Sequence, residues 1–77
     1  MAVGFVLITT EPGKEIEVRE SVSKFKTVVG QWIVFGMHDL FVKIEAEEES
    51  ELTRCIIQDI RSVPGISETR TLIGAEI

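Results

Sequence analysis

The chain has 77 residues and a formal net charge of −5, which make it one small acidic domain. A chain of this length buries only about 60% of the surface that its unfolded form exposes, so a core of its own gives marginal stability. The acidic balance argues against direct nucleic-acid binding, which needs a basic face. The sequence also has no apolar run of the length that spans a membrane.

The cysteine content removes two common ways of stabilising so small a domain. Cys55 is the single cysteine, so no internal disulfide can form, and no cluster of Cys and His indicates a structural metal. Self-association is the remaining route. The N-terminus lacks the basic segment of a signal peptide, so we also expect a reduced, cytoplasmic setting with Cys55 as a buried thiol.

The first half of the chain predicts a strand, a helix and a second strand. Residues 3–10 form an almost unbroken apolar run rich in branched side chains, which is typical of a central strand covered on both faces. A Pro-Gly pair then ends the strand and opens a helix over about residues 14–25. Residues 27–36 form the second strand. The apolar positions that recur at helical spacing are Val18, Val22 and Phe25.

The second half repeats this order as strand, helix, strand. Residues 39–46 alternate in character and predict the third strand. The acidic run 47–51 stands where a helix should begin, because negative charge stabilises the positive end of the helix dipole. A second Pro-Gly pair ends this helix, and residues 66–73 predict a last strand with the polar content of a sheet edge. The apolar stripe of the second helix is Leu52, Ile56, Ile60 and Val63.

The order β-α-β-β-α-β predicts an α+β fold, the ferredoxin-like sandwich, with two helices on one face of a four-stranded antiparallel sheet. The strands nevertheless carry apolar residues on both faces, since Phe5 and Leu7 oppose Val6 and Ile8. If this face were bare, its exposed apolar area would exceed what a soluble monomer usually tolerates. We therefore predict a dimer whose sheets meet through the helix-free faces. Trp32 is expected to anchor this interface, with a core position under a helix as the alternative.

The connection between the second and third strands contains a candidate binding site. Gly36 can offer a backbone N–H and Asp39 a carboxylate, and together these groups can hold a small zwitterion. Both residues also have structural interpretations. A tight connection needs a positive φ that glycine supplies, and aspartate often caps turns.

An ordered set of motifs extends along the chain. It consists of Glu-Pro-Gly (11–13), Val-Val (28–29), Gly-Met-His-Asp-Leu (36–40), Val-Lys-Ile-Glu-Ala (42–46), Val-Pro-Gly-Ile (63–66) and Thr-Arg-Thr-Leu-Ile (69–73). With this set the chain, from residue 3 to about 74, resembles the effector-binding domain of the Lrp/AsnC, or feast/famine, transcriptional regulators. The resemblance implies a ferredoxin-like dimer, commonly assembled further into rings of four, with an amino acid bound where dimers meet.

The resemblance also implies which residues form the pocket, namely the hairpin motif and polar residues of the last strand. By position these ligand-binding residues are Gly36, Met37, His38, Asp39, Thr69 and Thr71. It implies no catalytic residue, no cofactor and no metal. For the two threonines, ordinary β-propensity on an edge strand is the alternative, and for His38 a solvated loop histidine.

The chain departs from full-length family members because it carries no helix-turn-helix segment. We therefore expect a stand-alone domain over residues 1–77, which senses amino acids and passes the signal by co-assembling with a full-length Lrp/AsnC regulator. Two other classes stay open. One is a small dimeric α/β-barrel enzyme, which would need a cavity between sheet and helices, and the other is an amino-acid-binding ACT-type regulatory domain with the same element order.

Overall fold

The computed structural model describes residues 1–73, which form four strands and two helical segments in the predicted order. The elements are β1 (Ala2–Thr10), α1 (Glu15–Val22), β2 (Val28–Ile33), β3 (Leu40–Ala46), α2 (Glu49–Arg54), its π-helical continuation η1 (Cys55–Ile60), and β4 (Ile66–Ile73). No helix among these residues has the length and apolar character that crossing a membrane requires.

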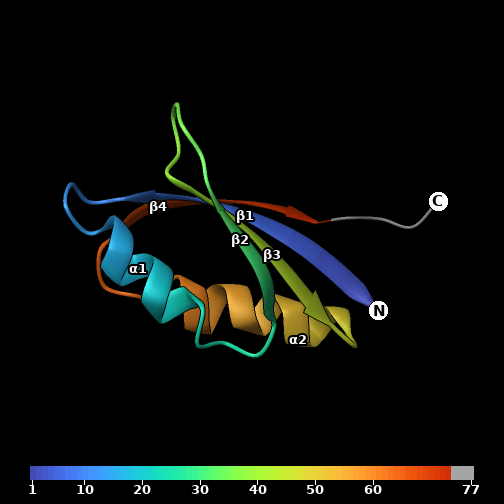
Figure 1. Cartoon of the computed structure of the whole chain (residues 1–77). Coiled ribbons are helices and arrows are strands. Elements are labelled where there is room, and N and C mark those ends of the chain that lie inside the picture. The colour runs from blue at the N-terminus through green and yellow to red at the C-terminus, as the bar shows by residue number, and fades with distance from the viewer. Residues whose placement is uncertain (74–77) are drawn as a thin grey trace.

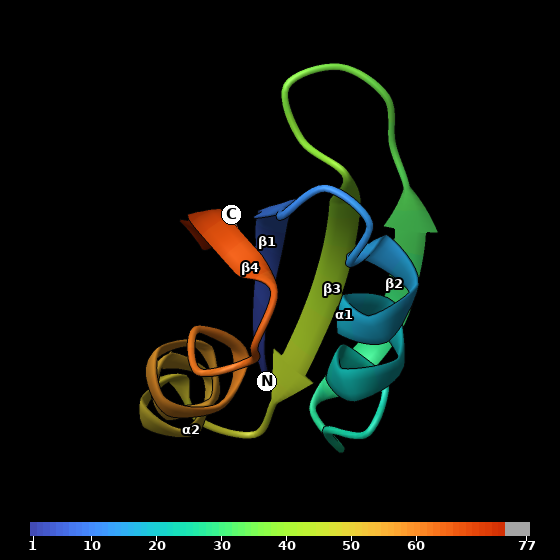
Figure 2. The same ribbon diagram turned by 90° about the vertical axis from the view of Figure 1, so that its left-hand side faces the viewer.

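The four strands form one antiparallel sheet in the order β2-β3-β1-β4, so β1 and β3 are central and β2 and β4 are the edges. Figure 1 shows both helices on the same side of this sheet, and Figure 2 shows α1 beside β2 and α2 on the β4 side. The predicted ferredoxin-like sandwich is therefore confirmed.

The hydrophobic core lies between the sheet and the two helices. Strands expose successive side chains on opposite faces, so every second residue of β1 and β3 points to the helices, and there the aliphatic side chains are buried. Residues three or four apart on the helices complete the core from the other side. The buried apolar residues are Val6, Ile8, Val18, Val22, Leu40, Val42, Ile44, Ala46, Leu52, Cys55, Ile56, Ile60 and Val63.

The first helix is shorter than its apolar pattern predicted. Residues 14–25 were expected to be helical, but α1 ends at Val22. Ser23 is the C-cap of this helix, and its hydroxyl donates to the carbonyl of Glu20. Phe25 still packs against the core from this connection, so its position in the apolar pattern was informative although its secondary structure was not helical.

The second helix changes its winding halfway along. From Cys55 the turns widen to the π-helical pattern, and after its end Arg61 donates its N–H to the carbonyl of Ile56, five residues back. Cys55 faces the core in this segment, where its sulfur contacts the hydroxyl of Thr27 in the connection before β2. The prediction of a buried thiol is confirmed.

The two Pro-Gly turns lie against each other. Glu11 donates its backbone N–H to the carbonyl of Gly65 at 2.7 Å, which joins the β1–α1 connection to the α2–β4 connection. Gly65 has φ of 97°, and a Cβ there would come within 3.0 Å of Val18 Cγ2. Only glycine therefore fits both the backbone conformation and the space beside α1.

The helix-free face of the sheet carries an aromatic cluster. The ring centroids of Phe5 and Phe41 are 5.3 Å apart, and those of Trp32 and Phe41 are 5.8 Å apart in an edge-to-face arrangement. The indole of Trp32 lies back over Gly30, where a Cβ would meet the ring at 2.9 Å. Trp32 is nevertheless 52% exposed. We define this helix-free face by Val3, Phe5, Leu7, Trp32, Phe41 and Leu72.

The buried thiol gives the first testable prediction. Burial raises the pKa of the Cys55 thiol above its ordinary value of 9.0. The unfolded chain then loses this proton at lower pH than the folded chain. The stability that the thiol contributes is therefore complete below pH 9.0 and is lost as pH rises through the raised pKa. Urea titrations at a series of pH values should show that the free energy of unfolding falls more steeply above pH 9.0 for the native chain than for Cys55→Ala.

The variant acts as its own control, because the cavity left by Cys55→Ala lowers the free energy of unfolding by a similar amount at each pH. Equal slopes for the two proteins in the alkaline range would contradict the prediction.

Candidate ligand site at the β2–β3 hairpin

The connection between β2 and β3 projects beyond the sheet and away from the helices (Figure 1). Two backbone hydrogen bonds close its base. Val34 donates its N–H to the carbonyl of Asp39 at 3.0 Å, and Asp39 donates its own N–H to the carbonyl of Ile8 at 2.8 Å. The second bond attaches the hairpin to β1, so the position of its base is fixed by the central strand of the sheet.

The side chain of Asp39 strengthens this attachment. Its Oδ2 accepts the backbone N–H of Thr10 at 2.8 Å and the hydroxyl of Thr10 at 3.1 Å. Thr10 is only 6% exposed, so both of its donors need a protein partner. Asp39 therefore has a structural role, as the sequence had suggested. Its hydrogen-bond partner is Thr10 on β1, however, and not a residue of the turn itself. The second carboxylate oxygen, Oδ1, has no hydrogen-bond partner among residues 1–73.

The tip of the hairpin is held more loosely. The hydroxyl of Thr9 lies 3.2 Å from the carbonyl oxygen of Met37 and 3.1 Å from Nδ1 of His38. Gly36 has φ of 126°, which confirms that this position uses the conformational freedom of glycine. The side chain of Met37 extends into solvent. The four predicted hairpin residues therefore lie together beside the end of β1.

The two predicted threonines of β4 lie elsewhere on the subunit. Thr69 pairs with Ile8 and Thr71 with Val6, so both point to the helix side of the sheet. β1 separates them from the hairpin, and two strand spacings amount to about 10 Å. The hydroxyl of Thr71 is buried and has no partner among residues 1–73. A single subunit thus brings Gly36, Met37, His38 and Asp39 together but not Thr69 and Thr71.

A hollow of about 340 Å³ opens between α1 and the base of the hairpin. We call it the α1–hairpin hollow. Sequence reasoning missed it, although two signals were present. Ile16 is an apolar residue among charged ones, and Phe35 stands next to a turn glycine. Its lining includes Glu15, Ile16, Arg19, Ile33, Phe35 and Asp39.

The hydrogen bonds of Asp39 predict the effect of two substitutions. Asp39→Ala leaves both buried donors of Thr10 unpaired and should lower the free energy of unfolding by about 1–3 kcal/mol in urea titrations. Asp39→Asn keeps an oxygen in place to accept both bonds and should cost clearly less. Glu47→Ala, which removes an exposed carboxylate, is the matched control. Equal stability of Asp39→Ala and the native chain would contradict this interpretation of the carboxylate.

Comparison with known proteins identifies the fold more closely. The family model of the Lrp/AsnC ligand binding domain matches residues 3–76. The HTH-type transcriptional regulator PH0140 of Pyrococcus horikoshii is 35% identical over 71 residues, which are 92% of this chain and 45% of that protein. The crystal structure of FFRP-DM1 has a TM-score of 0.93 and 36% identity, and the match covers 97% of this chain and 100% of that chain.

The fold extends to more distant proteins. The transcriptional regulator NMB0573 of Neisseria meningitidis, crystallised as a complex with L-Met, has a TM-score of 0.79 at 13% identity over 97% of this chain and 50% of that chain. The chain spans about half the length of the curated relatives it matches. Because the family model covers nearly every residue, the chain belongs to the Lrp/AsnC ligand-binding domain family, a regulatory domain of transcriptional regulators.

Proposed function

We propose that this chain is an amino-acid-sensing regulatory module, which binds a free amino acid at the hairpin where subunits meet. The observation that carries the proposal is the position of the hairpin in a domain of a ligand-binding family. The hairpin extends past its own sheet, and within residues 1–73 neither the backbone N–H of Gly36 nor the Oδ1 atom of Asp39 has a hydrogen-bond partner. A neighbouring subunit supplies the missing wall.

The β4 threonines fit this proposal only in an assembly. Within one subunit Thr69 and Thr71 lie two strands from the hairpin, so they contribute to its pocket only if the hairpin of another subunit reaches them. We therefore propose that the ligand-binding residues come from more than one chain. The ligand shifts the assembly because it binds one arrangement of subunits better than another.

The helix-free face supports a dimer as the basic unit. Its aromatic cluster lies on the one face of the sheet that no helix covers, and Figure 2 shows both helices on the other face. A second copy can cover it, because the same face on both subunits forms a two-fold interface. Large aromatic side chains at the centre of a patch commonly contribute most of the binding free energy. We propose that such dimers join further through their hairpins.

The enzyme alternative receives less support from the site. A small barrel enzyme would hold His, Tyr or Arg in a cavity between sheet and helices, but there the described part of the chain packs aliphatic side chains. The α1–hairpin hollow does lie on the helix side, but at the outer edge of the sheet beside β2. The family is a regulatory ligand-binding domain, and we propose no catalytic activity. The same family match favours this interpretation over an ACT-type domain.

We further propose that the module works as a single domain over residues 1–77. Because a regulator of transcription acts in the compartment that holds the DNA, we assign this module to the cytoplasm. Its acidic charge is unsuited to binding DNA directly. The signal would then pass by co-assembly with a longer Lrp/AsnC regulator that carries its own DNA reader.

The dimer is tested by charging the centre of the helix-free face. Light scattering after size-exclusion chromatography at micromolar concentration should give at least twice the 8.6 kDa chain mass for the native protein. Trp32→Glu should weaken self-association by about 30-fold or more, since an interface tryptophan is often worth ~2 kcal/mol. Ile57→Glu is the matched control, because Ile57 is 53% exposed on the opposite side of the molecule. A native monomer, or equal effects of the two variants, would refute the proposed interface.

Ligand binding is tested by isothermal titration with each of the twenty amino acids. At least one should bind at millimolar concentration or below and raise the melting temperature, because a ligand that binds only the folded state stabilises it. Asp39→Asn should weaken this binding by about tenfold, since it removes the charge from a charge-assisted hydrogen bond while keeping the bonds to Thr10. Absence of heat and of a thermal shift for all twenty would eliminate the proposed function.

A further inference from the structure

Basic side chains interrupt the apolar surface of the helix-free face in a regular way. Paired residues of neighbouring strands form rows that cross the sheet from β2 to β4. The first row consists of Trp32, Phe41, Leu7 and Arg70. The second row consists of Gly30, Lys43, Phe5 and Leu72. Each row therefore contains one basic side chain and at least one aromatic ring.

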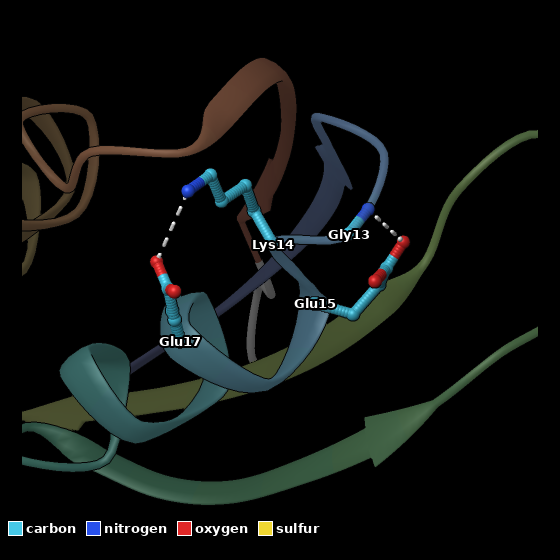
Figure 3. Close-up of polar contacts among 4 residues, drawn as sticks. All are labelled: Gly13, Lys14, Glu15 and Glu17. Atoms are coloured by element: carbon cyan, nitrogen blue, oxygen red, sulfur yellow. Dashed lines mark hydrogen bonds and ion pairs between the residues drawn. The ribbon is translucent and has the colours of Figure 1, made fainter.

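Neither basic side chain has a carboxylate partner in the described part of the subunit. Among residues 1–73 the structure contains one ion pair, between Lys14 Nζ and Glu17 Oε2 at 3.6 Å, and it lies on α1 (Figure 3). Arg70 is exposed on β4, and Lys43 is half-buried on the central strand β3. Cations of this kind are attracted by the faces of aromatic rings, and most strongly by tryptophan.

Trp32 and Arg70 cannot meet within one subunit. They stand at opposite edges of the first row, which are three strand spacings or about 14 Å apart, whereas a cation interacts with a ring over about 6 Å. The indole of Trp32 lies back over Gly30 and is still 52% exposed, so part of the ring is accessible from outside. A contact between the two side chains therefore needs a second copy of the chain.

The symmetry of a dimer limits how two helix-free faces can meet. A two-fold dimer uses the same face of both subunits, and the axis lies in the plane between the two sheets. An axis perpendicular to the strands places each strand over the same strand of the second copy. Arg70 then faces β4 of the second copy, and β4 contains no aromatic residue.

An axis parallel to the strands has a different result. It places β2 of one copy over β4 of the other and keeps each row opposite the same row, so Trp32 meets Arg70 of the second copy. In the second row Lys43 meets Phe5 of the second copy. Packed sheets cross at about 30° because they are twisted, and the long side chain of arginine can bridge the resulting offset. This arrangement gives both cations an aromatic partner.

We propose that the helix-free face recognises a second copy of this chain through Trp32 of one subunit and Arg70 of the other, with the guanidinium stacked on the indole. The two-fold axis makes this contact twice in each dimer. The inference rests on the dimer of the proposed function. It adds the direction in which the subunits meet and the two residues that favour a second copy over a protein without this pair.

The first test measures self-association of the full chain by analytical ultracentrifugation. Arg70→Gln should raise the dissociation constant of the dimer about fivefold or more, because it removes the cation. Arg70→Lys should raise it less, since it keeps a positive charge but not the planar group. Arg54→Gln on α2 is the matched control and should have no effect. Arg70 is exposed, so its variants should keep the native circular dichroism spectrum.

The second test mixes two variants to identify the partner of each residue. In a dimer of Trp32→Leu, or of Arg70→Gln, both contacts are lost. A mixed dimer keeps one contact, between Trp32 of the Arg70→Gln chain and Arg70 of the Trp32→Leu chain. Its dissociation constant should therefore be about fivefold lower than the geometric mean of the two parent dimers. Trp32 is the sole tryptophan of the chain, so only the Arg70→Gln chain fluoresces as tryptophan and reports the association.

The control for the mixture is the Arg70→Gln chain with the double variant Trp32→Leu/Arg70→Gln, which retains no contact and should show no such gain. If the native chain is a monomer, the proposed dimer fails and this inference fails with it. If the native chain is a dimer but Arg70→Gln behaves like Arg54→Gln, the contact is wrong while the dimer stands. The same conclusion follows if the mixture gains no more than its control.

Discussion

The antiparallel pairing of β1 with β3 is the constraint on which the rest of the structure depends. The register places Val6 opposite Val42 and Leu7 opposite Phe41, so alternate pairs point to opposite faces of the sheet. Even-numbered residues of both strands form the floor of the core, and odd-numbered ones, Lys43 and Glu45 among them, form the helix-free face that carries the aromatic cluster. A shift of one residue would exchange the two faces and destroy both at once.

The same central strand positions the hairpin. Ile8 accepts the N–H of Asp39 at the base of the hairpin, and Thr10 donates twice to the carboxylate of Asp39. Asp39 therefore joins the packing of the sheet to the geometry of the site. Under the proposed function, a ligand at the remaining oxygen of this carboxylate would contact a group that already stabilises the fold.

The two exposed apolar regions differ in shape and suit different occupants. The helix-free face is the broad side of a sheet with an aromatic centre, which fits the equally broad face of a second copy. The α1–hairpin hollow is concave, and its lining includes apolar side chains together with charged ones of both signs. The first lies on the helix-free side and the second on the helix side, so an occupant of one leaves the other accessible.

Local sequence patterns were enough to predict the order of the elements, the buried residues of the helices and strands, and the presence of apolar side chains on both faces of the sheet. These features follow from local periodicity, because side chains repeat every two residues in a strand and about every 3.6 residues in a helix. Three features are visible only in the folded chain: Thr10 is the partner of Asp39, Thr69 and Thr71 lie away from the hairpin, and Ile16 and Phe35 line the same hollow. Each of these depends on residues far apart in the chain, and their contact is set by strand order and register, which local patterns do not encode.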